Sequence, residues 1–478
     1  MSTPGPGAGG VAGGVAWGTP TARAVVAAAT LGSGLTLLDG TVVNVALRTI
    51  GEDLDASLVQ LQWITNGYFL SLASLILLGG SLGDRLGRRR VFVIGTVWFA
   101  LASLLCGIAP TAEVLIVARV LQGVGGALLT PGSLAMIQGA FRAEDRSRAI
   151  GAWSGLGGIA AALGPLVGGL LIDHASWRWI FLINLPLAAL TVWLAMRWVP
   201  ETRDTRTLDR FDVPGAALAS LALAGVTWAL TDAGGSTTWV AAGLGVAAAI
   251  GFVVVERRTH GPMVPLGLFA DRTFSAANAM TLVVYAALGA ILFFLVLQLQ
   301  TVAGYNALEA GLATLPMTAC MLFLAARGGA LGERIGPRIP MTFGPIVMAG
   351  GTLLLLLVGP DTVYWRDVAP GLTVFGLGLA LMVAPLTATV LAAAPDEVTG
   401  IASGINNAVA RAGSLLAVAA LPMAVGLAGD DYRDPARFDT AYGSAMLACA
   451  VLLVVGGLVS WFTIPHRVQT PPASTPPA

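Results

Sequence analysis

Fourteen long apolar runs are the feature that most restricts how this chain can fold. A helix needs about 20 apolar residues to cross a bilayer, and each run is long enough for one crossing. Only 11% of the residues are charged, against about 25% in soluble domains, so a water-soluble fold is excluded. We therefore expect an all-α integral membrane protein. The runs span residues 22–47, 60–82, 91–109, 112–136, 148–171, 178–198, 211–231, 236–256, 274–299, 306–327, 340–359, 367–394, 399–425 and 441–464.

A charged turn occurs twice in the chain. The segment GSLGDRLGRRR at 80–90 returns as GALGERIGPR at 329–338, each time between two apolar runs. The same offset of 249 residues relates GAWSG at 151–155 to GIASG at 400–404. Two turns on one membrane side are separated by an even number of crossings, and this offset, at roughly 30 residues per helix and loop, gives eight. A repeat of six helices with two extra helices between the copies fits this spacing.

The repeat predicts the domain organisation. We expect an N-terminal six-helix bundle at 21–200, a linker with the two extra membrane helices at 201–272, and a C-terminal six-helix bundle at 273–465. The ends, 1–20 and 466–478, are poor in large apolar residues, and we expect them to be disordered tails. Repeats of like topology are related by an axis along the membrane normal, with the substrate site between the halves.

The arginines predict the orientation. Every basic residue is an arginine, and most lie in alternate loops, at 84–90, 142–148, 197–210, 257–272 and 327–338. The opposite loops hold few, chiefly Arg48, Arg366, Arg433 and Arg437. The positive-inside rule then places the arginine-rich loops and both termini in the cytoplasm. The formal net charge is zero, and we expect no nucleic-acid partner.

Five motifs, in order along the chain, carry a family resemblance. They are Leu38-Asp39-Gly40-Thr41-Val42-Val43-Asn44, Gly80-x-Leu82-x-Asp84-Arg85-x-Gly87-Arg88-Arg89, Arg119-x-x-Gln122-Gly123-x-Gly125, Gly164-Pro165-x-x-Gly168-Gly169, and Trp177-Arg178-Trp179 followed by Asn184-Leu185-Pro186. Over nearly its whole length the chain resembles the fourteen-span drug:proton antiporters of the major facilitator superfamily, the EmrB/QacA-like multidrug efflux transporters. Arg48 stands where that family commonly has proline.

The resemblance implies a fold and a function. The fold is the major facilitator fold, with two six-helix bundles and two added helices. The function is proton-coupled export of hydrophobic or cationic drugs or antibiotics across the bacterial cytoplasmic membrane by alternating access. We expect a monomeric transporter, not an enzyme, that uses the proton gradient and no cofactor.

The resemblance also assigns roles to two motifs. The charged turns act as a gating loop, and Glu333 and Pro337 in the second copy predict a weaker latch there; topogenic charge alone is the alternative. The gating residues are Gly80, Asp84, Arg85, Gly87, Arg88, Glu333 and Arg334. The antiporter motif consists of Gly164, Pro165, Gly168 and Gly169. From the residues alone, these glycines and the proline predict a close-packed, bendable helix interface.

Asp39 is the one carboxylate well inside a predicted span. A charge there costs at least about 2.5–3.5 kcal/mol, so it needs a wet cavity or a partner. At 1.5 Å per residue, Asp39 lies about 13 Å from Arg48, and Arg119 about 9 Å from Glu113, so the two opposite charges reach similar depths. In the family fold their helices are neighbours. Burial favours the protonated form of Asp39, whereas a nearby arginine favours its ionised form, and this balance suits a proton-coupling site. The alternative is a permanent ion pair that only fixes helix packing.

Polar and aromatic side chains within the runs are candidate substrate contacts. Trp63 and Asn66 lie three residues apart, and so on one helical face, where they present an aromatic ring beside an amide. Gln122 shares the face of Arg119 and is expected to bond to it or to substrate. Helix packing is the alternative for most of this set. Its members are Gln62, Trp63, Asn66, Tyr68, Gln122, Gln298, Gln300, Asn406, Asn407 and Arg411.

Other functions fit the sequence less well. An exporter of a physiological metabolite, lipid or peptide would use the same motifs and is the main alternative. A membrane enzyme is disfavoured because the loops hold no nucleophile beside a base, no carboxylate pair and no metal-ligand spacing, and a phosphate-binding GxxxxGK[ST] loop is absent. A sensor or scaffold is disfavoured because the sequence contains no soluble domain.

Overall fold

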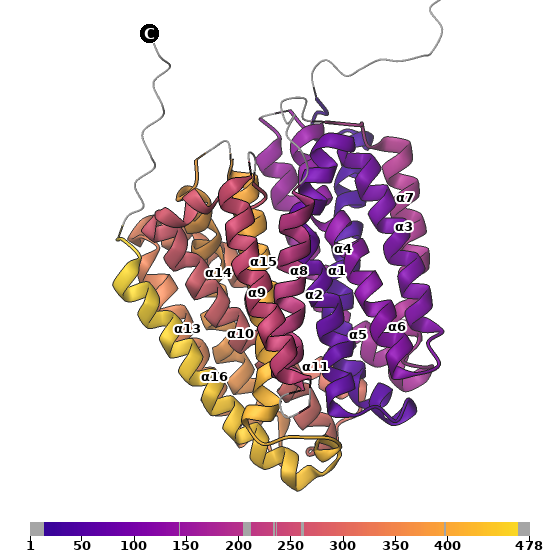
Figure 1. The fold of residues 1–478 in the computed structure, drawn as a ribbon, viewed down its shortest axis with the longest axis vertical. Coiled ribbons are helices and arrows are strands. Elements are labelled where there is room, and N and C mark those ends of the chain that lie inside the picture. The colour runs from indigo at the N-terminus through magenta and orange to yellow at the C-terminus, as the bar shows by residue number, and fades with distance from the viewer. Residues whose placement is uncertain are drawn as a thin grey trace, which may run out of the picture.

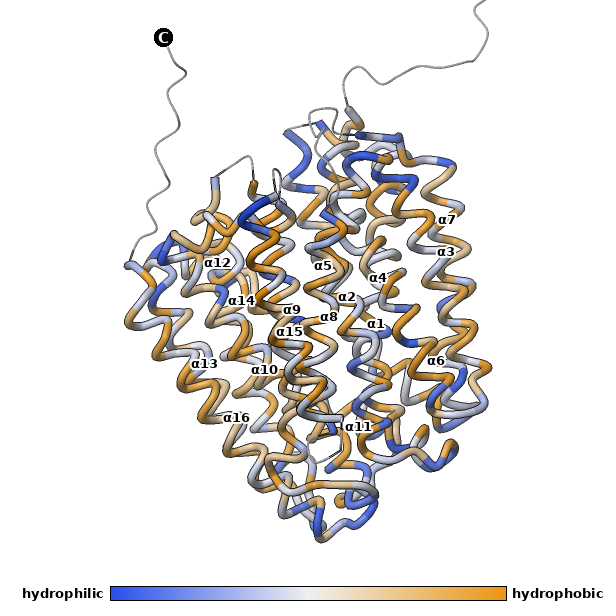
Figure 2. The backbone as a smooth tube through the Cα atoms, in the orientation of Figure 1, coloured by the Kyte–Doolittle hydropathy of each residue, from blue (hydrophilic) through white to orange (hydrophobic). Residues whose placement is uncertain are grey.

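The computed structural model describes residues 14–466 apart from 143, 204–211, 233–234, 236, 260–261 and 396–397. Over this part of the chain, fourteen helices are long and apolar enough to cross a membrane. Figure 2 shows apolar residues along the middle of the helices and hydrophilic residues gathered at both ends. The all-α membrane fold predicted from the apolar runs is therefore confirmed.

Six spans form the N-terminal half. They are α1 (Pro20–Asp53), α2 (Leu58–Leu86), α3 (Arg88–Gly107), α4 (Ala112–Ala140), α5 (Arg146–His174) and a span broken into α6 (Trp179–Leu182) and α7 (Asn184–Trp198). Helix α4 packs on both α2 and α3, and α1 packs on α5, α7 and α4. This packing places α1 between the motif-bearing helices α4 and α5.

The C-terminal half has the corresponding set of spans. They are α10 (Arg272–Thr301), α11 (Ala307–Ala313) with α12 (Leu315–Ile335), α13 (Arg338–Leu354), a π-helical turn η3 (Tyr364–Val368) with α14 (Ala369–Ala392), α15 (Thr399–Ala424) and α16 (Pro435–Thr463). The intervening helices α8 (Val213–Thr231) and α9 (Thr238–Arg258) pack on each other, and α8 also contacts α2 and α15. In Figure 1 this pair lies across the seam between the two halves.

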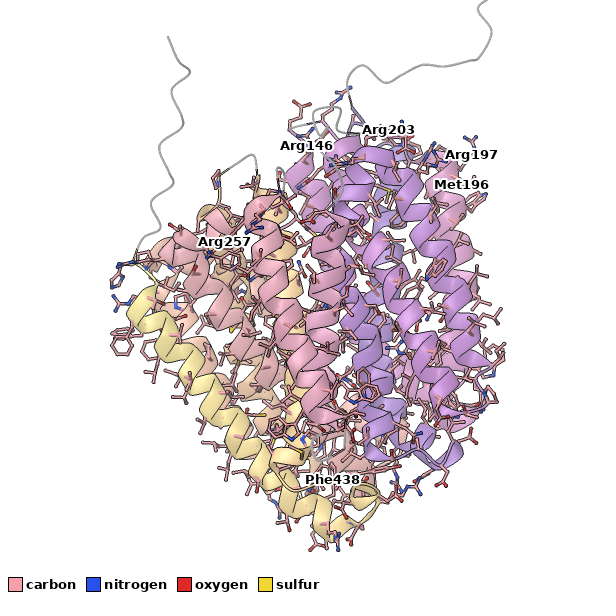
Figure 3. The ribbon with its side chains drawn as sticks, in the orientation of Figure 1. Arg146, Met196, Arg197, Arg203, Arg257 and Phe438 are labelled. Carbon is pink, nitrogen blue, oxygen red and sulfur yellow. The ribbon has the colours of Figure 1, made fainter. Side chains whose placement is uncertain are left out.

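The two ends of the helices differ in charge. Figure 3 labels Arg146, Arg197, Arg203 and Arg257 at one end and Phe438 near the other. We call these the arginine-rich end and the arginine-poor end.

The N-terminal tail is ordered closer to its start than we expected. The prediction of disorder over 1–20 is wrong for residues 14–19, because they pack against the α4–α5 connection. The backbone N–H of Val15 donates to Ala140 O at 2.8 Å, and that of Trp17 donates to an Asp145 carboxylate oxygen at 2.9 Å. Residues 1–13 and 467–478, for which we also predicted disorder, lie outside the described residues.

The two halves are joined at the arginine-poor end. The Asp173 carboxylate at the end of α5 accepts hydrogen bonds from the backbone N–H groups of Ala307 (3.2 Å) and Leu308 (2.9 Å), which begin α11. Nearby, the Tyr432 hydroxyl donates to Ala56 O at 2.7 Å. We refer to these two groups of contacts together as the clasp. Because each crosses from one half to the other, the molecule is closed at this end.

Candidate functional site

The structure brings Asp39 and Arg119 together in the N-terminal half. The Arg119 guanidinium lies 2.5 Å from an Asp39 carboxylate oxygen, and both side chains are buried, at 1% and 0% exposed. Gln122, one turn along α4, accepts from Arg119 at 2.6 Å and donates to the second Asp39 oxygen at 2.9 Å. Both carboxylate oxygens are therefore bonded, as an ionised acid in an apolar interior requires.

A polar chain extends this pair to neighbouring helices. The Gln122 amide also donates to the Ser103 hydroxyl at 3.1 Å, and the Asn184 amide donates to the same hydroxyl at 3.0 Å. Thus α1, α4, α3 and α7 are linked through one buried network. Sequence reasoning missed Ser103 because a single serine within an apolar run carries no periodic signal. Asn184 belongs to the last of the five family motifs, but nothing in the sequence indicates its role.

Aromatic rings enclose the guanidinium. Its central carbon lies 4.4 Å from the centre of the Tyr68 ring and 5.6 Å from that of Phe181, within the range of cation–π attraction. The remaining Nε–H of Arg119 donates to Ile64 O at 3.1 Å. Arg119 is thus held by an acid, an amide, a carbonyl and two rings, so its position is rigidly defined.

A cavity of about 360 Å³ lies mainly within the C-terminal half. Its walls come from α10, α14 and α15, with Leu37 of α1 contributed by the other half. Asn406, Asn407 and Arg411 line it, as three of the ten predicted substrate contacts. These residues lie in the half of α15 that begins at the arginine-rich end, so the cavity lies on the side of the molecule away from the clasp.

The other seven predicted substrate contacts do not line this cavity. The amides of Gln62, Gln298 and Gln300 instead donate to backbone carbonyls at 2.7, 3.0 and 2.8 Å, so they stabilise helix packing. Two of these bonds cross between the halves, from Gln62 to Val418 and from Gln300 to Val45.

The other four predicted substrate contacts outside the cavity, Trp63, Asn66, Tyr68 and Gln122, lie in the N-terminal half. The Trp63 ring packs against Trp228 of α8 at 5.6 Å, and the Tyr68 hydroxyl donates to Thr36 O at 3.3 Å. Asn66 is fully buried, and neither polar atom of its amide has a hydrogen-bond partner among the described residues. Gln122 belongs to the Asp39 network.

The first charged turn is held within the N-terminal half. The Arg88 guanidinium bonds to Asp84 at 2.8 Å, and Arg89 pairs with Glu201 at 3.6 Å. Gly87 has a φ of 112°, a conformation that favours glycine, and a Cβ there would lie 2.6 Å from the Glu201 carboxylate. Arg85 also has an interaction partner. The turn is thus fixed against the segment that follows α7.

The second charged turn is fixed differently. Glu333 makes no ion pair with any residue that the structure describes. The Arg338 guanidinium instead lies 4.5 Å from the Trp461 ring of α16. The turn therefore lacks the acid–arginine bond of the first copy.

The α5 motif makes the close contacts that its small residues predicted. A Cβ on Gly164 would collide with Thr41, and one on Gly168 with Val42, both on α1. A Cβ on Gly169 would collide with the backbone of Leu308 on α11, across the seam between the halves. These glycines therefore let α5 approach both α1 and the opposite half.

Known relatives support a transporter. The sequence profile described as Major Facilitator Superfamily matches residues 29–418. The chain is 36% identical over 415 residues to the tetracenomycin C resistance and export protein of Streptomyces glaucescens, covering 84% of this chain and 75% of that protein. It is 34% identical to a methylenomycin A resistance protein of Streptomyces coelicolor, covering 95% of each. It is 36% identical to multidrug resistance protein Stp of Mycobacterium tuberculosis, covering 82% and 73%.

Solved structures have the same fold. A D-xylose–proton symporter has a TM-score of 0.67 at 16% identity, covering 94% of this chain and 99% of that one. A bacterial homologue of the lysosomal transporter Spinster has a TM-score of 0.65 at 18% identity, covering 95% and 100%. With its bacterial relatives, this makes the chain a multi-pass inner-membrane transporter rather than an enzyme. The chain belongs to the major facilitator superfamily, and its resemblance to the fourteen-span drug-efflux branch is confirmed.

Proposed function

We propose that this protein is a proton-coupled antiporter that exports compact, amphipathic, antibiotic-like molecules from the bacterial cytoplasm by alternating access. The printed functions of the relatives, resistance to and export of antibiotics, support this substrate class. The arginine-rich end, with both termini, faces the cytoplasm by the positive-inside rule. The cavity then opens from the cytoplasmic side, and the clasp closes the outer side.

The observation that carries the proposal is the buried Asp39–Arg119 pair. Removing one partner of a buried ion pair destabilises a protein by about 3–5 kcal/mol, because the other charge is left uncompensated. Protonation of Asp39 has the same consequence for Arg119. If only one conformation keeps this pair, the proton changes the relative stability of the two conformations by up to about 3–5 kcal/mol. This approaches the about 5.5 kcal/mol that moves a ratio from 1:99 to 99:1, so the proton supplies most of the drive for such a switch.

The proposed cycle assigns a protonation state of Asp39 to each conformation. In the present conformation both Asp39 oxygens are bonded, one by Arg119 and one by Gln122, an arrangement that favours the ionised acid. This is the state expected after proton release to the cytoplasm, when substrate enters from the same side. Protonation from the outer side, in the alternate conformation, would free Arg119 and complete the exchange.

The size of the cavity bears on the alternatives. At about 360 Å³ it lies at the lower end of the range of roughly 300–1,000 Å³ for drug-sized sites. This favours a compact molecule over a lipid or a peptide. A small physiological metabolite remains the second candidate and would be exported by the same cycle.

The test is transport by Asp39→Asn in inside-out proteoliposomes. We expect methylenomycin A or tetracenomycin C to be taken up by wild type when a pH gradient is imposed, and a protonophore to abolish uptake. Asp39→Asn should retain substrate binding and lose gradient-driven uptake. Asp53→Asn is the matched control on the same helix, since Asp53 bonds to Trp177 and Arg178 at its end. Uphill uptake by Asp39→Asn at the wild-type rate, with the pH gradient as sole drive, would refute proton coupling at this site.

A further inference from the structure

The charge of the cavity wall has one sign. Arg411 is the one charged residue among those that line the cavity, and no acid lines it in the part of the chain that the structure describes. Its other polar groups are hydroxyls and amides, including those of Tyr285 and Asn407. The wall therefore attracts negative charge and hydrogen-bond acceptors, and it repels cations.

Among the residues that the structure describes, no acid pairs with Arg411. It makes neither an ion pair nor a hydrogen bond with any residue in the described ranges, and its closest ring contact is Phe69, at 5.6 Å from the ring centre. It lies near the middle of α15, a membrane-spanning helix. An unpaired arginine at membrane depth is unfavourable and marks a functional site.

Asp39 is not available as a partner for Arg411, because it is already paired. Asp39 is fully buried, and both its oxygens are bonded by Arg119 and Gln122. It does not line the cavity. Arg119 is bonded to an acid, an amide and a carbonyl, whereas Arg411 faces an open volume and is bonded to no such group among the described residues.

We infer that the transported molecule is a compact organic anion, such as a carboxylate, sulfonate or phenolate on an aromatic ring system, and that Arg411 binds its charged group. This rests on the proposed function and narrows its substrate class. It differs from the hydrophobic or cationic substrates that the family resemblance implied. The guanidinium offers paired N–H donors to an oxyanion, and Phe69 and Tyr285 supply aromatic surface beside it.

Substrate charge sets the electrical work of the cycle. Exchange of one proton for a monocation moves no net charge across the membrane. Exchange for a neutral molecule moves one charge, and exchange for a monoanion moves two. Each charge moved across 100 mV supplies roughly 50-fold accumulation, so a monoanion would reach roughly 2,000-fold. A membrane potential alone should therefore drive anion export strongly.

The experiment compares three probes that share one ring system: naphthalenesulfonate, naphthamide and naphthylmethylammonium. Binding of each to the purified full-length protein is measured by calorimetry. We expect wild type to prefer the sulfonate to the ammonium. Arg411→Gln should weaken sulfonate binding about ten- to hundredfold, the effect of losing charge-assisted hydrogen bonds. Naphthamide binding should change little, which also shows that the variant is folded, and Arg411→Lys should retain part of the sulfonate affinity.

Arg327→Gln is the matched control. Its guanidinium donates to Phe323 O at 2.7 Å on α12, and it does not line the cavity. Preference for the ammonium, or an unchanged sulfonate affinity in Arg411→Gln, would overturn the inference. If neutral or cationic compounds are still exported in an Asp39-dependent way, the proposed function survives that result. If instead the sulfonate binds through Arg411 but no proton gradient moves any compound, antiport fails and the anion site stands.

Discussion

Asp173 offers the clearest test of how the two halves are held. Its carboxylate, on α5, accepts from the N–H groups of Ala307 and Leu308 at the start of α11. These N–H groups belong to the first turn of a helix and have no intrahelical acceptor, and the helix dipole there favours a negative charge. Replacing Asp173 with alanine removes all of these interactions in the clasped conformation. The conformation that is open at the arginine-poor end does not contain them.

The expected magnitude follows from these contacts. Two hydrogen bonds contribute about 0.5–1.5 kcal/mol each, and the dipole about 0.3–1 kcal/mol. Asp173 is exposed, so solvent screening places the total near the lower end, at about 1–2 kcal/mol. Asp173→Ala should therefore shift the ratio of clasped to open molecules toward the open state by roughly 5- to 30-fold.

Pulsed electron spin resonance can measure this shift. Spin labels at Pro110 and Asp361, both exposed in loops at the arginine-poor end, report the distance between the halves in a cysteine-free background. The long-distance population should rise in Asp173→Ala. Glu113→Ala is the control, because Glu113 bonds to Gln60 within the N-terminal half. An unchanged distance distribution in Asp173→Ala, or an equal change in the control, would show that this contact does not hold the clasp.

Three further outcomes are expected. Gly169→Leu should keep α5 and α11 apart and reduce gradient-driven transport roughly five- to hundredfold, while Gly151→Leu, where an added Cβ meets nothing within 4 Å, should not. Gly87→Ala should lower the melting temperature in detergent, since alanine at a φ of 112° is strained by about 1–3 kcal/mol. Hydrogen bonds from the Ala428 backbone and from Arg437 hold the pKa of Asp431 below its usual range. The stability that Asp431 adds is therefore present above about pH 4 and lost at lower pH, so the melting temperatures of wild type and Asp431→Asn should converge on acidification.

The sequence predicted the spans because lipid imposes a simple requirement. Each crossing needs a long apolar run, and all fourteen predicted runs correspond to helices of the structure. The pairing of Asp39 with Arg119 was predictable for a related reason, since few charges occur at that depth and opposite ones are expected to meet. Depth along a helix can be counted from residue numbers, and the prediction combined this depth with the apposition of the two helices that the family fold implies.

The rotation of a side chain about its helix was harder to predict. In the sequence, Gln62 and Arg411 are both polar residues inside apolar runs. In the structure, Gln62 bonds to the backbone of α15, whereas Arg411 lines the cavity. The weak amphipathicity of membrane helices hides which face meets protein, lipid or water. The clasp was not predicted for a different reason, because Asp173 and the two N–H groups it binds lie 134 and 135 residues apart in the chain.

The location of the proton site restricts how it can drive the halves. Asp39 and Arg119 lie in the same half, so rigid rocking of the halves leaves their bond intact. Under the proposed cycle, protonation must therefore act by moving α1 relative to α4. Helix α1 meets α5 three residues further on, where Val42 packs against Gly168, and the last turn of α5 carries Asp173 at the clasp. Under this cycle we therefore expect the coupling between protonation and gating to run along α1 and α5. Gly168→Ala, which would collide with Val42, should separate proton binding from gating and leave the Asp39–Arg119 bond in place.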